Sequence, residues 1–131
     1  MKYIIWFSCF FLLSCKSDED ASLINKWKLD SYIKNSGSTV TLLSFPIHFV
    51  FEKDSTVKIN LNVNTCNGEY TKSSKKLTLK NFNCTKICCD SVASIEAYEL
   101  FIDSITTYEI NGKTLKLKGN YGTAMQLSLF Q

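Results

Sequence analysis

The sequence predicts a mainly β protein, either a curved antiparallel sheet or a small, partly open barrel of about eight strands, with one α-helix. Three observations support this prediction. Apolar and polar residues alternate along short segments, polar turns separate these segments, and the spacing becomes helical in a single stretch. The chain has 131 residues, which is enough for one domain of this kind but not for two.

The first strands are visible in the alternation of their apolar residues. In INKWKLDSYI, residues 24–33, Trp27, Leu29 and Tyr32 stand where a half-buried strand places inward side chains. The next two segments are expected to turn the following residues inward: Phe45, Ile47, Phe49 and Phe51, then Val57, Ile59, Leu61 and Val63. Polar residues such as Lys58 fall between the last four, so we expect antiparallel strands with one face exposed to water.

Two hairpins follow from their turn sequences. Tyr70 and a strand from residue 77 flank SSKK, and a tight turn there makes residues whose numbers sum to 149 face each other. Tyr70 then lies beside Leu79 and Cys66 beside Asn83, while Cys84 points to the other face unless a bulge intervenes. Asn-Gly at 111–112 predicts a type I′ turn with both residues at positive φ, and residues 125–130 form a last strand.

One stretch departs from the period of two. Apolar residues recur at three- and four-residue spacing at Val92, Ile95, Tyr98, Ile102 and Ile105. This spacing predicts one amphipathic helix over about residues 90–105, packed on the sheet through these side chains, with Asp90 or Ser91 as its N-cap.

The N-terminal segment predicts export and lipid anchoring. Residues 1–14 have one lysine followed by an apolar run that is too short to span a membrane but typical of a signal peptide. Leu12, Leu13, Ser14 and Cys15 resemble the bacterial lipobox, so Cys15 is expected to carry the lipid that attaches the protein to a membrane. Residues 15–22 then form the lipidated cysteine and an acidic tether, KSDEDAS, and residues 23–131 form the β domain.

The tether also resembles the surface-export signal of lipoproteins in the Bacteroidota. We therefore expect an outer membrane lipoprotein that is displayed on the cell surface. The composition argues against one class of partner: all 15 basic residues are lysine, and the sequence has no arginine fork of the kind that nucleic-acid readers use.

Several motifs together resemble a known family. NTCNGEY at 64–70, CTKICC at 84–89, the predicted helix and TTYEINGKTLKL at 106–117 are similar to the META domain, the HslJ-like family of small bacterial envelope lipoproteins. The matching positions are Trp27, Cys66, Asn67, Gly68, Tyr70, Thr85, Cys89, Gly112, Leu115 and Leu117. This chain departs from the family pattern because Asn67 runs directly into Gly68 and because Cys84 and Cys88 are extra, as in a Bacteroidota-type variant. The resemblance implies a compact β-rich domain without established catalytic residues, in a family with some members linked to stress or antibiotic tolerance.

Four cysteines remain in the β domain: Cys66, Cys84, Cys88 and Cys89. An even number in an oxidising compartment predicts two disulfides, and three connectivities are open. The family resemblance favours Cys66 with Cys89, which leaves Cys84 to pair with Cys88. A zinc site is not expected from this spacing, and a redox pair at Cys88 and Cys89, just before the helix, is a weaker hypothesis.

The remaining candidate residues indicate no catalytic site. His48, the sole histidine, lies on the opposite strand face from Phe49 and is expected to be an ordinary strand residue. The leading hypothesis is a monomeric, lipid-anchored envelope domain with a structural or binding role, linked to stress tolerance, that binds an envelope protein or a wall component. No catalytic, cofactor or metal residues are assigned. The alternatives are a lipocalin-like carrier of a small ligand and a thiol oxidoreductase.

Overall fold

The computed structural model describes residues 21–41 and 45–131. Cys15, the signal peptide at 1–14 and most of the tether at 15–22 lie outside the described residues. The elements are β1 (Lys26–Ile33), β2 (Thr39–Thr41), β3 (His48–Phe51), β4 (Thr56–Asn60), β5 (Thr65–Ser73), β6 (Lys76–Cys84), α1 (Val92–Ser104), β7 (Ile105–Asn111), β8 (Thr114–Gly119), a 3₁₀ turn η1 (Asn120–Gly122) and β9 (Ala124–Leu129). This confirms the predicted mainly β fold with one helix.

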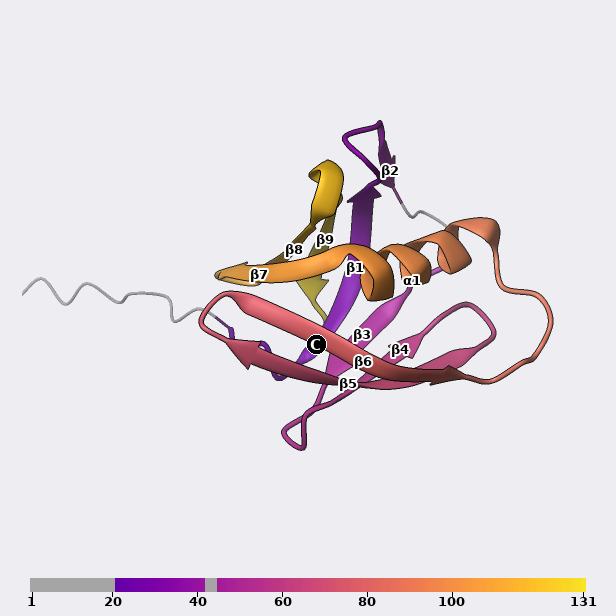
Figure 1. The fold of residues 1–131 in the computed structure, drawn as a ribbon. Coiled ribbons are helices and arrows are strands. Elements are labelled where there is room, and N and C mark those ends of the chain that lie inside the picture. Colours follow the sequence, from indigo (N-terminus) through magenta and orange to yellow (C-terminus); the bar gives the residue numbers. More distant parts are fainter. Residues whose placement is uncertain (1–20, 42–44) are drawn as a thin grey trace, which may run out of the picture.

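The strands form a closed antiparallel barrel (Figure 1). Neighbours pair in the order β1-β3-β4-β5-β6-β7-β8-β9, and β9 pairs again with β1 to complete the ring. The extra strand β2 pairs with the second half of β1, while β3 pairs with its first half. Closure leaves few free strand edges, because almost every strand has a partner on both sides.

The barrel is weakest between β6 and β7. In that ladder Lys76 pairs with Thr107, and a single further bond joins the Tyr108 N–H to the Lys75 carbonyl. The helix α1 covers the place where the two strands diverge (Figure 1). Its Phe101 is fully buried and meets the ring of Phe49 at 4.7 Å, so a helix side chain supplies contacts that a longer β6–β7 pair would otherwise make.

Large side chains fill the interior of the barrel. Side chains less than 2% exposed include Trp27, Tyr32, Phe49, Phe51, Phe101, Leu29, Ile59, Leu115, Leu117 and Met125. The strand assignments for Trp27, Leu29 and Tyr32 are thus confirmed. The predicted inward positions of Phe45 and Val63 are wrong, because these side chains are 50% and 40% exposed. Phe45 lies before β3 and Val63 lies after β4. The folded part begins before residue 23, since the Ala21 N–H donates to the Gly112 carbonyl.

The helix exists where it was expected, but its buried face differs from the prediction. Ser91 is the N-cap, and its side chain accepts a hydrogen bond from the Ser94 N–H. Val92 and Ile95 are 83% and 44% exposed, so these two side chains do not pack on the sheet as predicted. The buried helix residues are Ser94, Ala97, Leu100 and Phe101. The buried face is therefore rotated relative to the predicted one, which leaves two aliphatic side chains in solvent.

The second hairpin also differs in detail from the prediction. Asn111 pairs with Thr114, so the two-residue loop is Gly112 and Lys113 rather than Asn111 and Gly112. Gly112 has a φ of 57°, whereas neither Asn111 nor Lys113 has a positive φ. The type I′ assignment is wrong, because a type I′ loop needs a positive φ at both positions.

Candidate binding site at the disulfide-linked loops

The disulfide Cys66–Cys84 joins β5 to β6 at the end of their hairpin. Near the turn the predicted register is correct, and Tyr70 lies opposite Leu79. Between Asn67 and Glu69 the register shifts by one residue, so Cys66 faces Cys84 instead of Asn83. The predicted pairing of Cys66 with Cys89 is wrong because this β-bulge puts Cys84 directly across the ladder from Cys66.

The bulge places two residues, Asn81 and Phe82, opposite Gly68. Asn81 adopts a φ of 56°, the left-handed conformation that asparagine tolerates better than most residues. Gly68 is buried, and a Cβ atom there would lie 2.5 Å from the Phe82 ring. The family-motif glycine is thus required by the close approach of the Phe82 ring, a contact that no local sequence pattern indicates.

The second disulfide joins the sequence neighbours Cys88 and Cys89. The predicted pairing of Cys84 with Cys88 is wrong for the same reason, since Cys84 is already bonded to Cys66. Cys88 and Cys89 are exposed in the connection between β6 and α1. This bridge closes no long chain segment and leaves both sulfurs at the surface.

Asn64 and Asp90 hold the two connections at this end together. One Asp90 carboxylate oxygen accepts the N–H groups of Val63, at 2.6 Å, and Asn64, at 3.1 Å. Its other oxygen accepts from the Asn64 side-chain amide at 2.7 Å. Burial raises the pKa of Asp90, but these hydrogen bonds from Asn64 and Val63 outweigh it and hold the pKa below its usual value. We call this interaction the Asn64–Asp90 clasp.

The clasp extends to Thr85, another family-motif residue. The Asn64 side-chain oxygen accepts from the Thr85 hydroxyl and from the Ile87 N–H, both at 2.8 Å. The Asn64 amide also donates to the Ile87 carbonyl at 2.6 Å. Asn64 is buried and its polar atoms are used on both sides, so the β4–β5 connection and the β6–α1 connection form one rigid unit.

Asp90 was one of the two residues expected to cap the helix. Ser91 makes the capping bond, and the Asp90 carboxylate is occupied by N–H donors of the other loop. Its role in the fold is therefore to join two loops. Sequence reasoning missed this role because the partners are 26 and 27 residues apart in the chain.

Four exposed aliphatic side chains lie on the two connections that the clasp joins and on the start of α1. Their exposed fractions are 40% for Val63, 58% for Ile87, 83% for Val92 and 44% for Ile95. Val63 and Ile87 are bonded through their backbones to Asp90 and Asn64, and Val92 follows Asp90 closely. Val92 and Ile95 are three residues apart on one face of α1. We call these four residues the apolar rim.

The other family-motif residues have structural roles. The Trp27 indole N–H donates to the Leu23 carbonyl at 3.0 Å, and the Tyr70 hydroxyl donates to the Glu52 carbonyl at 2.8 Å. Both rings are buried. Asn67 is exposed on β5 opposite Asn83. These residues do not converge on a reactive centre.

His48 lies far from the cysteines in sequence and is half-buried on β3. Its ring meets Phe130 edge to face at 4.6 Å, and within the described residues its Nε2 atom has no hydrogen-bond partner. Burial lowers the pKa of His48, and the nearby Lys26 and Lys28 lower it further. No carboxylate orients the ring among its described hydrogen bonds, so the arrangement does not match a nucleophile–histidine–acid site.

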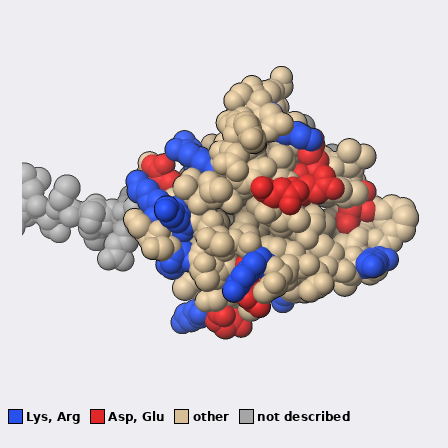
Figure 2. Space-filling model, in the orientation of Figure 1, with Lys and Arg blue, Asp and Glu red and all other residues tan. Residues whose placement is uncertain are grey.

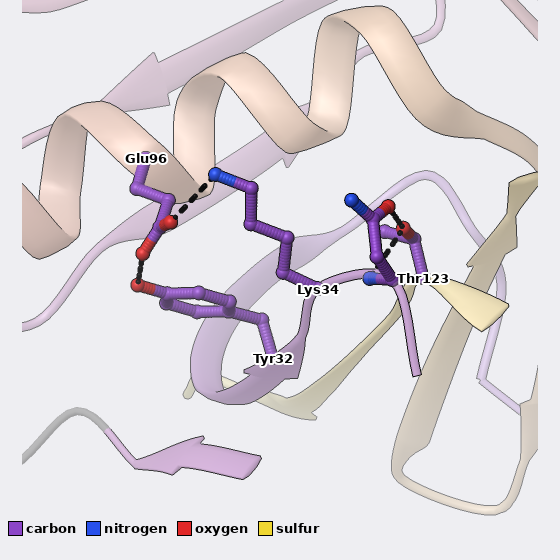
Figure 3. A network of polar contacts seen from close by, with 5 residues as sticks. Tyr32, Lys34, Glu96 and Thr123 are labelled. Carbon is purple, nitrogen blue, oxygen red and sulfur yellow. Dashed lines mark hydrogen bonds and ion pairs between the residues drawn. The ribbon is translucent and has the colours of Figure 1, made fainter. Parts of the chain in front are cut away.

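A polar network fixes the helix to β1 on another part of the surface (Figure 3). The Tyr32 hydroxyl donates to Glu96 at 2.6 Å, and Lys34 forms an ion pair with the same carboxylate at 2.9 Å. The hydrogen bond from Tyr32 and then that from Lys34 lower the pKa of Glu96. Nearby, Thr123 bonds to Asn35, so the β1–β2 turn is also tied to the start of β9.

Two further properties hold for the part of the chain that the structure describes. It contains no group of three or more His, Cys, Asp or Glu side chains that could hold a metal ion. Its single α-helix is too short and too polar to cross a membrane.

Comparison with known proteins identifies the family. The model of the META domain matches residues 21–129. The chain belongs to the META domain family. The match begins at Ala21, the residue whose N–H donates to the Gly112 carbonyl, so this contact lies within the matched residues.

Solved structures share the fold of this META domain at low sequence identity. An NMR structure of a protein from Burkholderia xenovorans has 16% identity and a TM-score of 0.65, covering 82% of this chain and 83% of the other. A second NMR structure has 21% identity and a TM-score of 0.60, covering 81% and 89%. The crystal structure of a DUF4847 family protein from Bacteroides vulgatus has 13% identity and a TM-score of 0.63, covering 80% and 92%. The search of curated proteins found no match.

Proposed function

We propose that this META domain is a lipid-anchored, non-catalytic binding domain of the bacterial cell envelope, whose apolar rim contacts another envelope protein. In this proposal Cys15 carries the lipid, the protein is displayed on the outer membrane as a monomer until it binds, and binding contributes to tolerance of envelope stress. The observation that carries the proposal is the apolar rim: Val63 and Ile87 are exposed on two connections that the Asn64–Asp90 clasp joins, and Val92 and Ile95 are exposed at the start of α1.

The chemistry of the rim favours a protein partner. Contiguous exposed aliphatic side chains are typical of protein contact surfaces, whereas an isolated exposed Val or Ile has no such meaning. Aliphatic groups offer no hydrogen bonds to the hydroxyls of a wall glycan. Binding would also cost this domain little loop entropy, because the Asn64–Asp90 clasp and the Cys66–Cys84 disulfide already order the connections that carry the rim.

The absence of a catalytic role is part of the proposal. His48 is the only histidine. Its ring contacts Phe130, and the charged groups that act on its pKa are Lys26 and Lys28 rather than a carboxylate. The Asp90 carboxylate is bonded to three N–H groups of the neighbouring loop and is not free to accept a substrate proton. Reproducible turnover of a substrate that is lost with His48→Gln would contradict this part of the proposal.

The filled interior argues against a small-ligand carrier. Rings of Trp27, Tyr32 and Phe101 occupy the space that a lipocalin would leave for a ligand. Among the hollows of the described residues, one of about 360 Å³ lies at Thr39, Lys116 and Gln126, and another of about 400 Å³ lies at the β6–β7 junction. Both open to the outside of the barrel.

A second candidate function rests on the exposed Cys88–Cys89 disulfide just before α1. Exposed bridges can be more easily reduced than buried ones and can take part in thiol exchange. Titration with glutathione redox buffers, followed by alkylation and mass measurement, tests this candidate. Thiol exchange would be supported if Cys88 and Cys89 are reduced at a potential near that of the glutathione pool while Cys66–Cys84 stays oxidised; two bridges that both resist reduction would exclude it.

In-cell photo-crosslinking tests the binding proposal. A photoreactive amino acid replaces Val92, which is 83% exposed, and in a matched control it replaces Tyr121, which is 86% exposed in η1. We expect a defined adduct from position 92 that is absent from position 121 and is lost when Ile95→Asp is added. Equal adducts from both positions, or none from position 92, would contradict a binding role of the rim. The intact mass of the extracted protein shows separately whether Cys15 is acylated.

A further inference from the structure

The described part of the chain begins beside a group of lysines. The Ala21 N–H is bonded to the Gly112 carbonyl, so the first described residue lies against the β7–β8 turn. Lys113 belongs to that turn. Lys75 lies in the neighbouring β5–β6 turn, Lys76 is the first residue of β6, and Lys72 lies near the end of β5. Figure 2 shows the basic side chains gathered beside the start of the described chain.

These four lysines, Lys72, Lys75, Lys76 and Lys113, form what we call the basic face. The two turns are close because the Tyr108 N–H bonds to the Lys75 carbonyl, and β7 continues only three residues further, roughly 10 Å, to Asn111. All four side chains are exposed. None of them is a member of the four ion pairs found among the described residues, which involve Lys28, Lys34, Lys80 and Lys118.

Acidic side chains gather elsewhere. Glu96, Glu99 and Asp103 lie on α1, and Figure 2 shows a group of acidic residues on the part of the surface that this helix covers. The acidic side chains of α1 thus lie away from the basic face. A negatively charged surface would attract the basic face and repel the helix, so both effects favour the same orientation.

The short chain between Cys15 and Ala21 limits the distance between the basic face and the membrane that holds the lipid on Cys15. Six peptide steps separate Cys15 from Ala21, and a fully extended chain spans about 3.5 Å per step, so the separation is at most roughly 20 Å. This segment contains Lys16 and three acidic residues, Asp18, Glu19 and Asp20, so its net charge is smaller in magnitude than that of four lysines. The tether cannot neutralise the basic face by itself.

We propose that the basic face binds the anionic headgroups of the membrane that holds the lipid on Cys15, so that the domain stands on this face. This inference rests on the proposed lipid anchoring, because the lipid brings the basic face within reach of the headgroups. Each lysine near an anionic lipid surface strengthens binding by a factor of about five, so four lysines can orient a domain that is already anchored.

Lysine acetylation read by mass spectrometry tests this orientation. The full-length lipidated protein is reconstituted into vesicles of phosphatidylcholine with phosphatidylglycerol, into vesicles of phosphatidylcholine alone, and into detergent. We expect Lys72, Lys75, Lys76 and Lys113 to react at least about threefold more slowly in the anionic vesicles than in the other two. Lys58 and Lys86 are exposed elsewhere on the domain and should react equally in all three, and high salt should abolish the difference.

Charge-reversal variants add a second measurement. In Lys75→Glu/Lys113→Glu both changes lie in exposed turns, so the fold should be retained, and protection of Lys72 and Lys76 should disappear. The matched variant Lys58→Glu/Lys86→Glu has the same change in net charge and should keep the protection. Loss of protection in both variants would overturn the proposal, because net charge rather than the basic face would then govern binding.

The outcomes separate this inference from the proposed function. An acylated protein whose four lysines react equally in both vesicle types overturns the orientation but leaves the anchoring intact. Equal protection in detergent and in vesicles also overturns it, because the acidic tether rather than lipid would then cover the lysines. A native protein without acyl mass on Cys15 overturns the anchoring and, with it, the orientation.

Discussion

The Cys66–Cys84 disulfide should stabilise the fold far more than Cys88–Cys89. The first bridge joins residues 18 positions apart and the second joins neighbours. In the chain-entropy description a loop of this size restricts the unfolded chain by about 3 kcal/mol, whereas a bridge between neighbours restricts it very little. The double variant Cys66→Ala/Cys84→Ala should therefore lose about 3 kcal/mol of unfolding free energy, and Cys88→Ala/Cys89→Ala much less.

Urea unfolding followed by tryptophan fluorescence measures this difference. With a urea dependence near 2 kcal/mol per M, a loss of about 3 kcal/mol moves the midpoint down by about 1.5 M. Trp27 is fully buried and should report the loss of the core. If the two double variants have the same midpoint, or if Cys88→Ala/Cys89→Ala is the less stable, the assigned loop does not account for the stability.

Trypsin mapping checks the connectivity itself, because Lys86 separates Cys84 from Cys88 and Cys89. The structure predicts that the unreduced digest contains peptide 59–72 joined to peptide 81–86, with peptide 87–113 unattached and lighter by two hydrogens. A species that joins all three peptides would refute the assignment and leave Cys66 paired with either Cys88 or Cys89. The two outcomes differ by the full mass of a 27-residue peptide, residues 87–113.

Three further changes test the loops and the barrel wall. Gly68→Ala puts a Cβ atom against the Phe82 ring and should cost roughly 1–3 kcal/mol in urea unfolding; a loss below that range would show that the ring moves aside freely. Asp90→Ala leaves the Val63 and Asn64 N–H groups without their acceptor and should cost about 2 kcal/mol, with faster amide exchange at both positions, and unchanged exchange would contradict the clasp. The folded pKa of His48 lies below its unfolded value near 6.5, so the contribution of His48 to stability should be constant above pH 6.5 and should be lost as the pH falls through the folded pKa. His48→Gln should flatten this part of the stability profile. An unchanged slope would assign the pH dependence to other groups.

Much of the fold could be predicted because it depends on local alternation. The inward positions of Trp27, Leu29, Phe49 and Ile59 follow from the period of two, and all four are buried. The helix follows from its own spacing and its Ser91 cap. Closure of the barrel was less certain, because it depends on pairing between β1 and β9, the first and last strands, which no local pattern reports.

The candidate site could not be predicted to the same degree, because its contacts join residues far apart in sequence. Asn64 and Asp90 are ordinary loop residues in the sequence, and only the fold brings the carboxylate to the N–H groups 26 and 27 residues earlier. The cysteine count predicted two disulfides but not their partners. To predict the partners, the position of the β-bulge in β6, where two residues lie opposite Gly68, would have to be known.

The extra residue of this β-bulge also connects the disulfide to the exposed rim. Opposite Gly68 the bulge turns Phe82 toward the helix, where its ring lies 6.1 Å from both Tyr98 and Phe101. A helix held by Phe101 and Tyr98 buries Ala97 and Leu100, and the side chains of Val92 and Ile95 in its first turn are then left in solvent. The same shift places Cys84 against Cys66 and leaves Cys88 and Cys89 free to bond each other. A variant that deletes Asn81 keeps Cys84 opposite Cys66 but puts Phe82 directly across the ladder from Gly68. We expect the Cys66–Cys84 disulfide to form and the exposure of Ile95 to change, and an unchanged exposure of Ile95 would show that the bulge does not set the position of the helix.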